Sequence, residues 1–438
     1  MTKPRVLWYS NILLPEAATG VGRAMPKGSG WWMTALLNRI RVRDDLEIAV
    51  VSEGGRRNAR FRVDGVEYFV LRTPLLRGLR NRLNSYRDVM ALDSQLVKYA
   101  DIVNDWKPDL VHVHGVESTF GLIKARGMVH TPMAVSIQGL MQPCAAKAYG
   151  ELNPEQLRGS FGRSNFTRLQ WKRFRARIPA ERAILKAADV VIGRTEWDCA
   201  WASAYDPSVC YRHVDEILRP EFYEAACWSA ERSVPHQLFC TTGPTALKGI
   251  HVLIEAVGIV RQSVPDVRLN LASGGFVPVA TNEYARYVRK LITTLGVQTN
   301  ITFLGHLEAD GLVKQLQQAS CYVTPSFVEN SSNALQEAML LGVPCIATAS
   351  GGTPSIIDNQ RTGLLFAPGD PALLALRILR VFKDREFAAK IGLGARQVSL
   401  ERNDPARVEG QVLKVYRELA GAPGDIEARG ILGHSIGG

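Results

Sequence analysis

The sequence predicts an α/β protein made of two doubly wound, Rossmann-like domains that face a central cleft. Short apolar runs of the kind found in buried parallel strands alternate with helical segments, and this alternation occurs twice along the chain. A chain of 438 residues is also too long for one hydrophobic core. Because ligands bind outside the carboxyl ends of such strands, two facing sheets would offer one site for each of two substrates.

The first half contains five runs with the continuous hydrophobicity of strands buried on both faces. They are residues 5–10, 47–52, 110–115, 133–139 and 189–194. The segment 220–235 carries prolines at its ends and separates this strand series from the next, so we expect it to be the linker. The first domain is therefore placed at residues 1–225.

The second half repeats the scheme. Strands are predicted at 236–243, 267–274, 301–305, 321–326, 344–349 and 363–368, and helices at about 249–263, 280–295, 310–319, 332–341 and 371–382. The second domain is placed at 232–404. A helix at about 405–420 is expected to pack back on the first domain, and the Gly-rich residues 421–438 are expected to form a flexible tail.

The net charge of +11 lies entirely in the first half, where residues 1–220 hold 33 Lys and Arg against 22 Asp and Glu. The excess is densest at 56–87 and 158–182, where Arg alternates with aromatic and aliphatic residues. Such surfaces bind anionic membranes or acidic acceptors, or are simply solvated. No nucleic-acid motif accompanies them, so nucleic acid is not an expected partner.

Seven scattered cysteines and the lack of a secretion signal favour a reducing, cytoplasmic location. The longest apolar stretches fall well short of the roughly 20 residues that cross a bilayer. We therefore expect a cytoplasmic protein, with peripheral binding to the inner face of the membrane left open.

The most informative stretch is 323–352, where a strand ends, a polar loop follows and a helix begins near Ser331 or Ser332. Asn330, Ser331 and Ser332 are all good N-cap residues. The amides at 332–334 would then point into the cleft with the positive end of the helix dipole behind them. This arrangement suits an anion such as a diphosphate.

Two carboxylates flank this helix start, Glu329 in the loop and Glu337 inside the helix. A carboxylate only accepts hydrogen bonds, so beside a phosphate pocket it is best used on hydroxyl groups. A ribose and a sugar would supply them. The alternative is that Glu337 is a surface residue and Glu329 a partner of the helix dipole.

The stretch 239–257 repeats the strand–loop–helix design. Gly243 is expected to let the backbone turn, and Lys248 and Gly249 stand at the helix start. Lys248 could neutralise the same diphosphate. The alternative, which the segment taken by itself favours, is a solvated lysine before a helix.

These residues resemble glycosyltransferase family four, whose members are retaining enzymes with the two-domain GT-B fold. The resemblance covers nearly the whole chain and rests on the E-x7-E element from Glu329 to Glu337, followed by EAMLLGVPCIAT and GGTPSIIDNQRTGLLFAPGD. It implies that Glu337 binds the ribose of a nucleotide sugar and that Glu329 contacts sugar hydroxyls near the reacting carbon. It also implies a diphosphate-binding Lys248. The donor-binding residues are then Gly243, Lys248, Gly249, Glu329, Asn330, Ser331, Ser332, Asn333 and Glu337, with Glu329 and Lys248 as the catalytic pair.

In the first half, Gly28 and Gly30 match the family's glycine-rich loop, and KPDLVHVHG resembles its PD-x-x-H-x-H segment. His112 and His114 alternate along a strand, and we expect them to point to opposite faces, with His114 the candidate for contact with acceptor or donor. Gln138 stands where the family often has a sugar-contacting His.

The family also often carries an Arg four to five residues before the Lys, and here the segment reads Gly243-Pro244-Thr245. Diphosphate neutralisation is therefore expected to rest on Lys248 and the helix start.

The expected reaction is transfer of a sugar from a nucleoside-diphosphate sugar to a saccharide or lipid-linked acceptor, in bacterial surface polysaccharide or glycoconjugate synthesis. The family scheme lets the leaving phosphate take the proton from the acceptor, so no cofactor and no metal are expected. Two alternatives remain, a nucleotide-sugar epimerase of the same fold and a non-catalytic nucleotide-sugar-binding subunit.

Overall fold

The computed structural model describes residues 3–23, 30–72, 93–158, 166–273, 276 and 282–421. The chain divides into two compact units. The first unit comprises residues 1–142, 172–217 and 403–438, and the second unit comprises 143–171 and 218–402. The predicted tail at 421–438, apart from Gly421, and parts of both basic segments, 73–87 and 159–165, lie outside the described residues.

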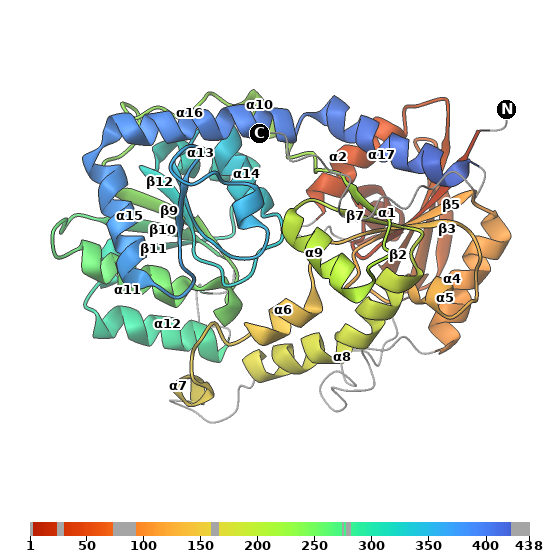
Figure 1. The fold of residues 1–438 in the computed structure, drawn as a ribbon, viewed down its shortest axis with the longest axis horizontal. Coiled ribbons are helices and arrows are strands. Elements are labelled where there is room, and N and C mark those ends of the chain that lie inside the picture. Colours follow the sequence, from red (N-terminus) through yellow and green to blue (C-terminus); the bar gives the residue numbers. More distant parts are fainter. Residues whose placement is uncertain are drawn as a thin grey trace. The chain divides into compact units, whose positions relative to one another are not determined.

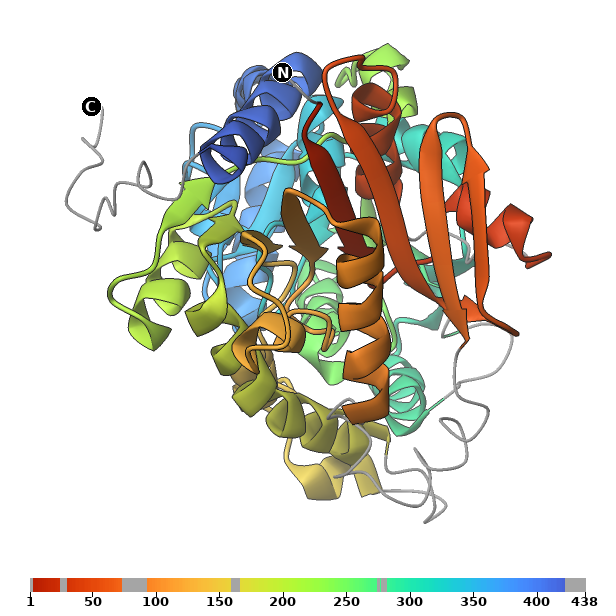
Figure 2. The same ribbon diagram turned by 90° about the vertical axis from the view of Figure 1, so that its right-hand side faces the viewer.

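The first unit contains an eight-stranded sheet in the order β3-β4-β2-β1-β5-β6-β7-β8. Its strands are β1 (Arg5–Ser10), β2 (Glu47–Gly55), β3 (Ala59–Val63), β4 (Val66–Arg72), β5 (Leu110–His114), β6 (Met133–Ser136), β7 (Val190–Gly193) and β8 (Tyr211–His213). All pairs are parallel except β3 with β4, which lie at one edge of the sheet (Figure 2). The five predicted strands are present, and β3, β4 and β8 were not predicted.

Helices cover both faces of this sheet, because its central strands carry apolar side chains on both sides. The helices are α1 (Pro15–Gly20), α2 (Trp31–Ile40), α4 (Asp93–Trp106), α5 (Leu122–Ala125), α9 (Glu196–Tyr205) and α17 (Pro405–Ala420). The last of these packs on β5 and β6, and Trp8 Nε1 donates a hydrogen bond to Tyr416 Oη at 2.8 Å. Residues from the carboxyl end of the chain therefore complete the first core.

The second unit contains a six-stranded parallel sheet in the order β11-β10-β9-β12-β13-β14. Its strands are β9 (Gln237–Thr241), β10 (Arg268–Ala272), β11 (Ile301–Gly305), β12 (Cys321–Thr324), β13 (Cys345–Thr348) and β14 (Leu364–Phe366). All six predicted strands are present, most of them shorter than expected. Most of the predicted residues that lie beyond the observed strand ends are Gly, Pro, Ser or Thr, among them Gly243, Pro325 and Pro344.

The helices of the second unit are α7 (Pro154–Arg158), α10 (Pro220–Glu224), α11 (Ile250–Val260), α12 (Glu283–Thr294), α13 (Ala309–Gln318), α14 (Asn333–Leu340), α15 (Pro371–Lys383) and α16 (Arg385–Arg402). The helix α11 contacts α12 and α15, and α14 contacts α10 and α16 (Figure 1). The segment 220–235, predicted to be a linker, begins with α10 and packs in the core of this unit.

The unit boundaries differ from the sequence prediction, which assigned residues 1–225 to one domain. Residues 143–171 belong to the second unit, and the chain enters and leaves this segment within α6 (Met141–Ala146) and α8 (Phe166–Ala187). The chain enters the second unit again between residues 217 and 218 and stays in it until residue 402, because α10 packs against α13 and α14. No sequence signal marked the 143–171 excursion.

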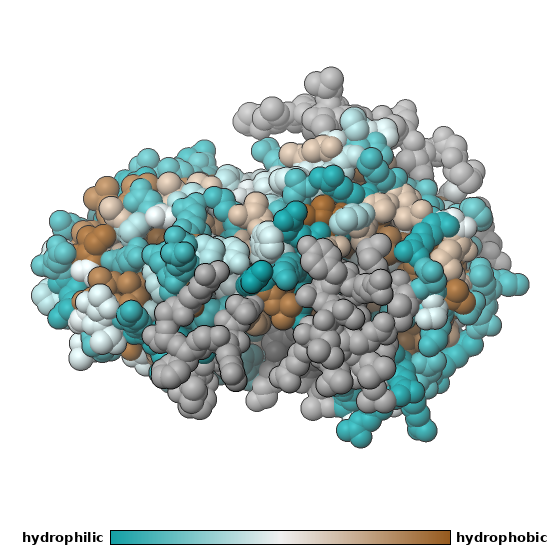
Figure 3. All heavy atoms as spheres, turned by 90° about the horizontal axis from the view of Figure 1, so that it is seen from below, coloured by the Kyte–Doolittle hydropathy of each residue, from teal (hydrophilic) through white to brown (hydrophobic). Residues whose placement is uncertain are grey.

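On the face drawn in Figure 3, the hydrophobic side chains that are not grey form small groups between hydrophilic ones. Among the described residues, no helix combines the length and the apolar character that a bilayer span requires.

Candidate functional site

The candidate site of the second unit lies at the point where its strand order reverses. From β9 the chain builds outward through β10 and β11, then returns to place β12 on the other side of β9. The loops that follow two such neighbouring strands diverge at their carboxyl ends and leave a crevice between them. Lys248 stands after β9 and Glu329 stands after β12, so the reversal brings the two predicted catalytic residues together.

Lys248 and Glu329 form an ion pair, with Lys248 Nζ 2.5 Å from Glu329 Oε1. Ser326 Oγ donates to the same carboxylate oxygen at 2.7 Å. Burial lowers the pKa of Lys248, but the adjacent carboxylate more than offsets this, so the net pKa lies above its usual value. The ammonium is therefore charged at neutral pH and stands where an anionic ligand would meet it.

Two glycines bring the loops this close. Gly249 has φ +67°, and a Cβ there would lie 2.0 Å from the Pro325 carbonyl oxygen. Gly351 has φ +56°, and a Cβ there would lie 1.9 Å from the Glu329 carbonyl oxygen. The predicted turn residue Gly243 has no such constraint, because its φ is not in the left-handed region and a Cβ would meet no atom within 4 Å. The backbone turn therefore does not require a glycine at 243, and the left-handed conformation lies at Gly249 instead.

The helix α14 begins at Asn333, with Ser332 as its N-cap. The Ser332 hydroxyl accepts from the Leu335 amide at 3.4 Å, and Ser331 Oγ accepts from Gln336 Nε2 at 3.0 Å. Asn333 Oδ1 is buried and has no hydrogen-bond partner in the described part of the chain. Asn330 is also buried, directly before the helix. This helix start is the predicted anion site.

Glu337 does not stand free on the helix surface, since its two carboxylate oxygens accept from Arg219. Arg219 Nε lies 2.6 Å from Oε1, and Nη2 lies 2.6 Å from Oε2. Burial raises the pKa of the Glu337 carboxyl, and the Arg219 guanidinium partly offsets the rise. The interpretation of Glu337 as a surface residue is wrong, because the residue is only 5% exposed.

Arg219 was missed by the sequence analysis. It stands before Pro220 at the start of α10, in the stretch first taken as linker. The sequence Leu-Arg-Pro-Glu-Phe could have indicated this residue, because its Arg lies between Leu218 and Phe222, which are both buried in the core of the second unit.

In the first unit, the structure describes three of the four predicted acceptor-side residues. Gly28 lies outside the described residues. Gly30 is the N-cap of α2 and has φ +82°. A Cβ at this position would lie 2.9 Å from the Ile12 side chain, so only a glycine fits here without strain.

His112 and His114 point to the same face of the sheet, which corrects the prediction that they diverge. Residues i and i+2 of a strand share a face, and the two ring centroids are 3.8 Å apart. His112 bonds through Nδ1 to Tyr416 Oη at 2.8 Å and through Nε2 to Ser136 Oγ at 2.7 Å. Burial lowers the pKa of His112 to about 3 and that of His114 well below its usual value. Both rings are therefore neutral at physiological pH.

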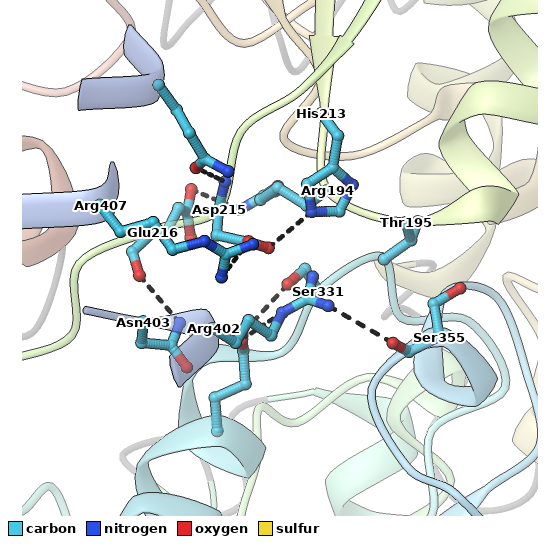
Figure 4. Close-up of polar contacts among 12 residues, drawn as sticks. Arg194, Thr195, His213, Asp215, Glu216, Ser331, Ser355, Arg402, Asn403 and Arg407 are labelled. Carbon is cyan, nitrogen blue, oxygen red and sulfur yellow. Dashed lines mark hydrogen bonds and ion pairs between the residues drawn. The ribbon is translucent and has the colours of Figure 1, made fainter. Parts of the chain in front are cut away.

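Gln138 follows β6 and lies beside a buried ion pair between Arg194 and Glu216. Its Nε2 donates to Glu216 Oε1 at 3.3 Å, and Arg194 Nη2 donates to the Ile137 carbonyl at 2.8 Å. Figure 4 shows that the neighbouring Asp215 accepts from His213 and faces Arg407. Neither Arg194 nor Glu216 was predicted.

A second missed group lies at the strand reversal of the first unit, between β1 and β5. Asn11 Nδ2 donates to Glu117 Oε1 at 2.5 Å, while Glu117 Oε2 is buried without a partner among the described residues. Burial raises the pKa of Glu117 and of the nearby Glu181 to about 7. The sequence signal that could have identified this group is the presence of polar residues directly after the strands 5–10 and 110–114.

Comparisons with known proteins match both units. Residues 28–207 match the family model described as a glycosyl transferase 4-like domain, and residues 242–398 match the model described as glycosyl transferases group 1. D-inositol 3-phosphate glycosyltransferase from Corynebacterium efficiens is 32% identical over 181 residues, or 41% of this chain and 42% of that protein. The chain thus spans less than half the length of the curated relatives it matches first.

Two solved structures share the fold over almost the whole chain. Sucrose-phosphate synthase from Thermosynechococcus elongatus superposes with a TM-score of 0.71 at 17% identity, covering 95% of this chain and 99% of that one. HepE from Anabaena, solved with UDP and glucose, superposes with a TM-score of 0.64 at 16% identity, covering 94% and 98%.

Proposed function

We propose, from the premise that the chain belongs to the family-four glycosyltransferases with the GT-B fold, that it transfers a sugar from a nucleoside-diphosphate sugar to an acceptor with retention of configuration. The predicted family and fold are confirmed. HepE, whose structure contains UDP and glucose, supports a nucleotide sugar as the donor.

The observation that carries the proposal is the group formed by Lys248, Glu329 and the start of α14. Lys248 supplies a positive charge, and the helix start supplies amides. Asn333 Oδ1 is buried without a partner among the described residues and can accept from a hydroxyl group. A diphosphate would accept hydrogen bonds from Lys248 and the amides, and the ribose and sugar hydroxyls would donate to Glu337 and Glu329.

This arrangement supplies what glycosyl transfer requires. As the bond between the sugar and the diphosphate breaks, negative charge grows on the leaving phosphate, and Lys248 and the α14 amides stabilise it. The acceptor hydroxyl attacks from the face on which the phosphate leaves, and its proton passes to that phosphate. Glu329, held by Lys248 and Ser326, orients the sugar near the reacting carbon. The leaving phosphate is the base, so a protein base at Gln138 is not needed.

A screen of UDP-, GDP- and ADP-sugars by thermal shift tests the donor part of this proposal. We expect one nucleotide class to raise the unfolding temperature, because a ligand of the folded state stabilises it. Products are then analysed with and without an acceptor. Turnover of the donor to an isomer without acceptor would indicate an epimerase, and donor binding with no hydrolysis or transfer would indicate a binding subunit.

We further propose that the acceptor belongs to bacterial surface polysaccharide or glycoconjugate synthesis and is met at the inner face of the membrane. The excess of positive charge confined to residues 1–220 supports this proposal. Sedimentation with vesicles tests it. We expect binding to vesicles that contain anionic lipid and much weaker binding to neutral ones, and equal binding to both would contradict it.

A further inference from the structure

A small pocket opens at the carboxyl ends of β5 to β8, and every residue that lines it belongs to the first unit. Its volume is about 30 Å³, enough for two oxygen-sized groups. The polar residues that line it include His114, Gln138, Arg194 and Glu216. The pocket is thus too small for a whole sugar ring and large enough for the polar edge of one.

Two polar groups in this wall lack partners among the described residues. His114 is 1% exposed, and neither of its ring nitrogens has a hydrogen-bond partner there. Glu216 is 7% exposed, and its Oε2 has none either. Burying an unpaired polar group is unfavourable, so two in one pocket point to a ligand that pairs them.

The surrounding contacts hold both groups in place and prevent them from pairing with their neighbours. Arg194 and Gln138 hold the Glu216 carboxylate from its other side. His112 is fully used by Tyr416 and Ser136, so it has no ring nitrogen left for His114. The His114 ring packs against Trp8, with centroids 4.4 Å apart, and against His112. The site is therefore rigid before any ligand arrives.

The chemistry of the two free groups selects hydroxyl groups. A carboxylate oxygen only accepts, and a neutral imidazole donates from one nitrogen and accepts at the other. A hydroxyl group can satisfy both kinds of partner. A phosphate or carboxylate would be repelled by Glu216, whose charge Arg194 already balances. Asp215, the next carboxylate along, is likewise balanced by Arg407.

We propose that this pocket binds two neighbouring hydroxyl groups of a neutral sugar or cyclitol ring, with Glu216 Oε2 accepting from one and His114 bonding the other. The inference rests on the proposed transferase function and identifies the recognised part of the acceptor as an uncharged ring polyol. Glu216 is then a specificity-determining residue, and Arg194 is the residue that positions it.

Calorimetry on the full chain tests this inference with D-glucose, D-mannose and myo-inositol, and with cyclohexanol as a ring that carries one hydroxyl group. We expect at least one polyol to bind and cyclohexanol not to bind. Glu216→Gln removes the charged acceptor while keeping the side-chain shape, and it should weaken polyol binding at least tenfold. His114→Phe keeps the ring packing and should weaken binding as well.

The matched control is Glu409→Gln, which changes another ion-paired carboxylate of the first unit, bound to Arg39 and Arg43. It should leave polyol binding unchanged. A variant counts only if its thermal unfolding and its nucleotide-sugar binding match those of the parent chain.

Two results would overturn the inference: no polyol binds, which leaves the pocket to water, or Glu216→Gln binds the polyol as the parent does. Donor hydrolysis by the same preparation separates the two proposals. If the protein cleaves the nucleotide sugar but binds no polyol, the proposed transferase function stands and the proposed polyol site is contradicted.

Discussion

Arg219 holds Glu337 through two parallel hydrogen bonds, each 2.6 Å long, in which the guanidinium fork meets both carboxylate oxygens. The pair is buried, with side-chain exposures of 13% for Arg219 and 6% for Glu337. It connects the start of α10 to the middle of α14, so the carboxylate proposed to meet the ribose is fixed from within the second unit. A ribose hydroxyl can donate to Glu337 without displacing Arg219, because each carboxylate oxygen accepts more than one hydrogen bond.

Arg219→Ala should lower the free energy of unfolding by about 3–5 kcal/mol, because it leaves a buried carboxylate without its cation. Urea unfolding measures the change. Arg361→Ala is the control, since the pair of Arg361 with Asp358 is largely exposed, and it should change stability by less than about 0.5 kcal/mol. Equal effects of the two substitutions would contradict the role given to Arg219.

Glu337→Ala should weaken binding of the nucleotide sugar by about 1–3 kcal/mol, the usual contribution of a hydrogen bond to a charged group. Calorimetry with the donor found by the thermal-shift screen measures this. Glu337→Gln, which keeps one acceptor for Arg219, separates lost binding from lost folding. Unchanged affinity in a folded variant would remove Glu337 from the donor site.

Glu329→Gln should lower kcat more than it weakens donor affinity, because Glu329 is proposed to act near the reacting carbon. It also leaves Lys248 without its carboxylate partner, so the donor affinity of Glu329→Gln is compared with that of Lys248→Met to separate the two effects. Steady-state kinetics and donor titration give the two quantities. A larger loss in affinity than in kcat would contradict the assignment.

Removal of divalent cations by EDTA should leave the transfer rate unchanged. The proposed scheme stabilises the diphosphate with Lys248 and the α14 amides. Initial rates with EDTA, and after addition of Mg²⁺ or Mn²⁺, provide the measurement. A rate that falls with EDTA and recovers with either cation would refute the scheme.

The stability of the first unit should fall as pH rises from about 4.5 to 7. Burial raises the pKa of Glu181 from 4.5 to about 7, although the Met141 amide and the Tyr205 hydroxyl donate to it. A carboxyl with a raised pKa in the folded state is fully stabilising below its unfolded pKa, and this contribution is lost as pH passes through the folded pKa.

Urea unfolding at several pH values measures the effect. Glu181→Gln should remove about 1–3 kcal/mol of the decrease between pH 5 and pH 8. Burial also raises the pKa of Glu117 to about 7, so part of the decrease in stability with pH should remain in the Glu181→Gln variant. An identical slope in parent and variant would show that Glu181 is ionised as in water.

Most of the parallel strands and the loops of the candidate site could be predicted because their signals are local. Buried parallel strands are continuous apolar runs, and the cap residue Ser332 sits where the polar loop ends. The strand β3 escaped prediction because its sequence ARFRV alternates Arg with apolar residues, and only pairing with β4 makes it a strand. The ion pair of Arg194 with Glu216 could not be predicted, because the two residues are 22 positions apart in the sequence. They come together only through the strand order of the sheet, which the sequence does not reveal.

The error at His112 and His114 has a different origin. Their spacing was read correctly, but a strand repeats every two residues, so the spacing places both rings on one face. Both rings line the pocket on that shared face. His112 has hydrogen-bond partners, and His114 has none among the described residues.

The excursion of residues 143–171 into the second unit limits how this chain can be divided. His251 Nε2 lies 3.0 Å from the Gly150 carbonyl oxygen, and the Thr167 amide donates to Glu283 at 2.5 Å. A fragment that starts at residue 218 loses both partners and exposes the flanks of α11 and α12. An exchange of the second unit between relatives must therefore graft two separate stretches of the polypeptide, 143–171 and 218–402, together.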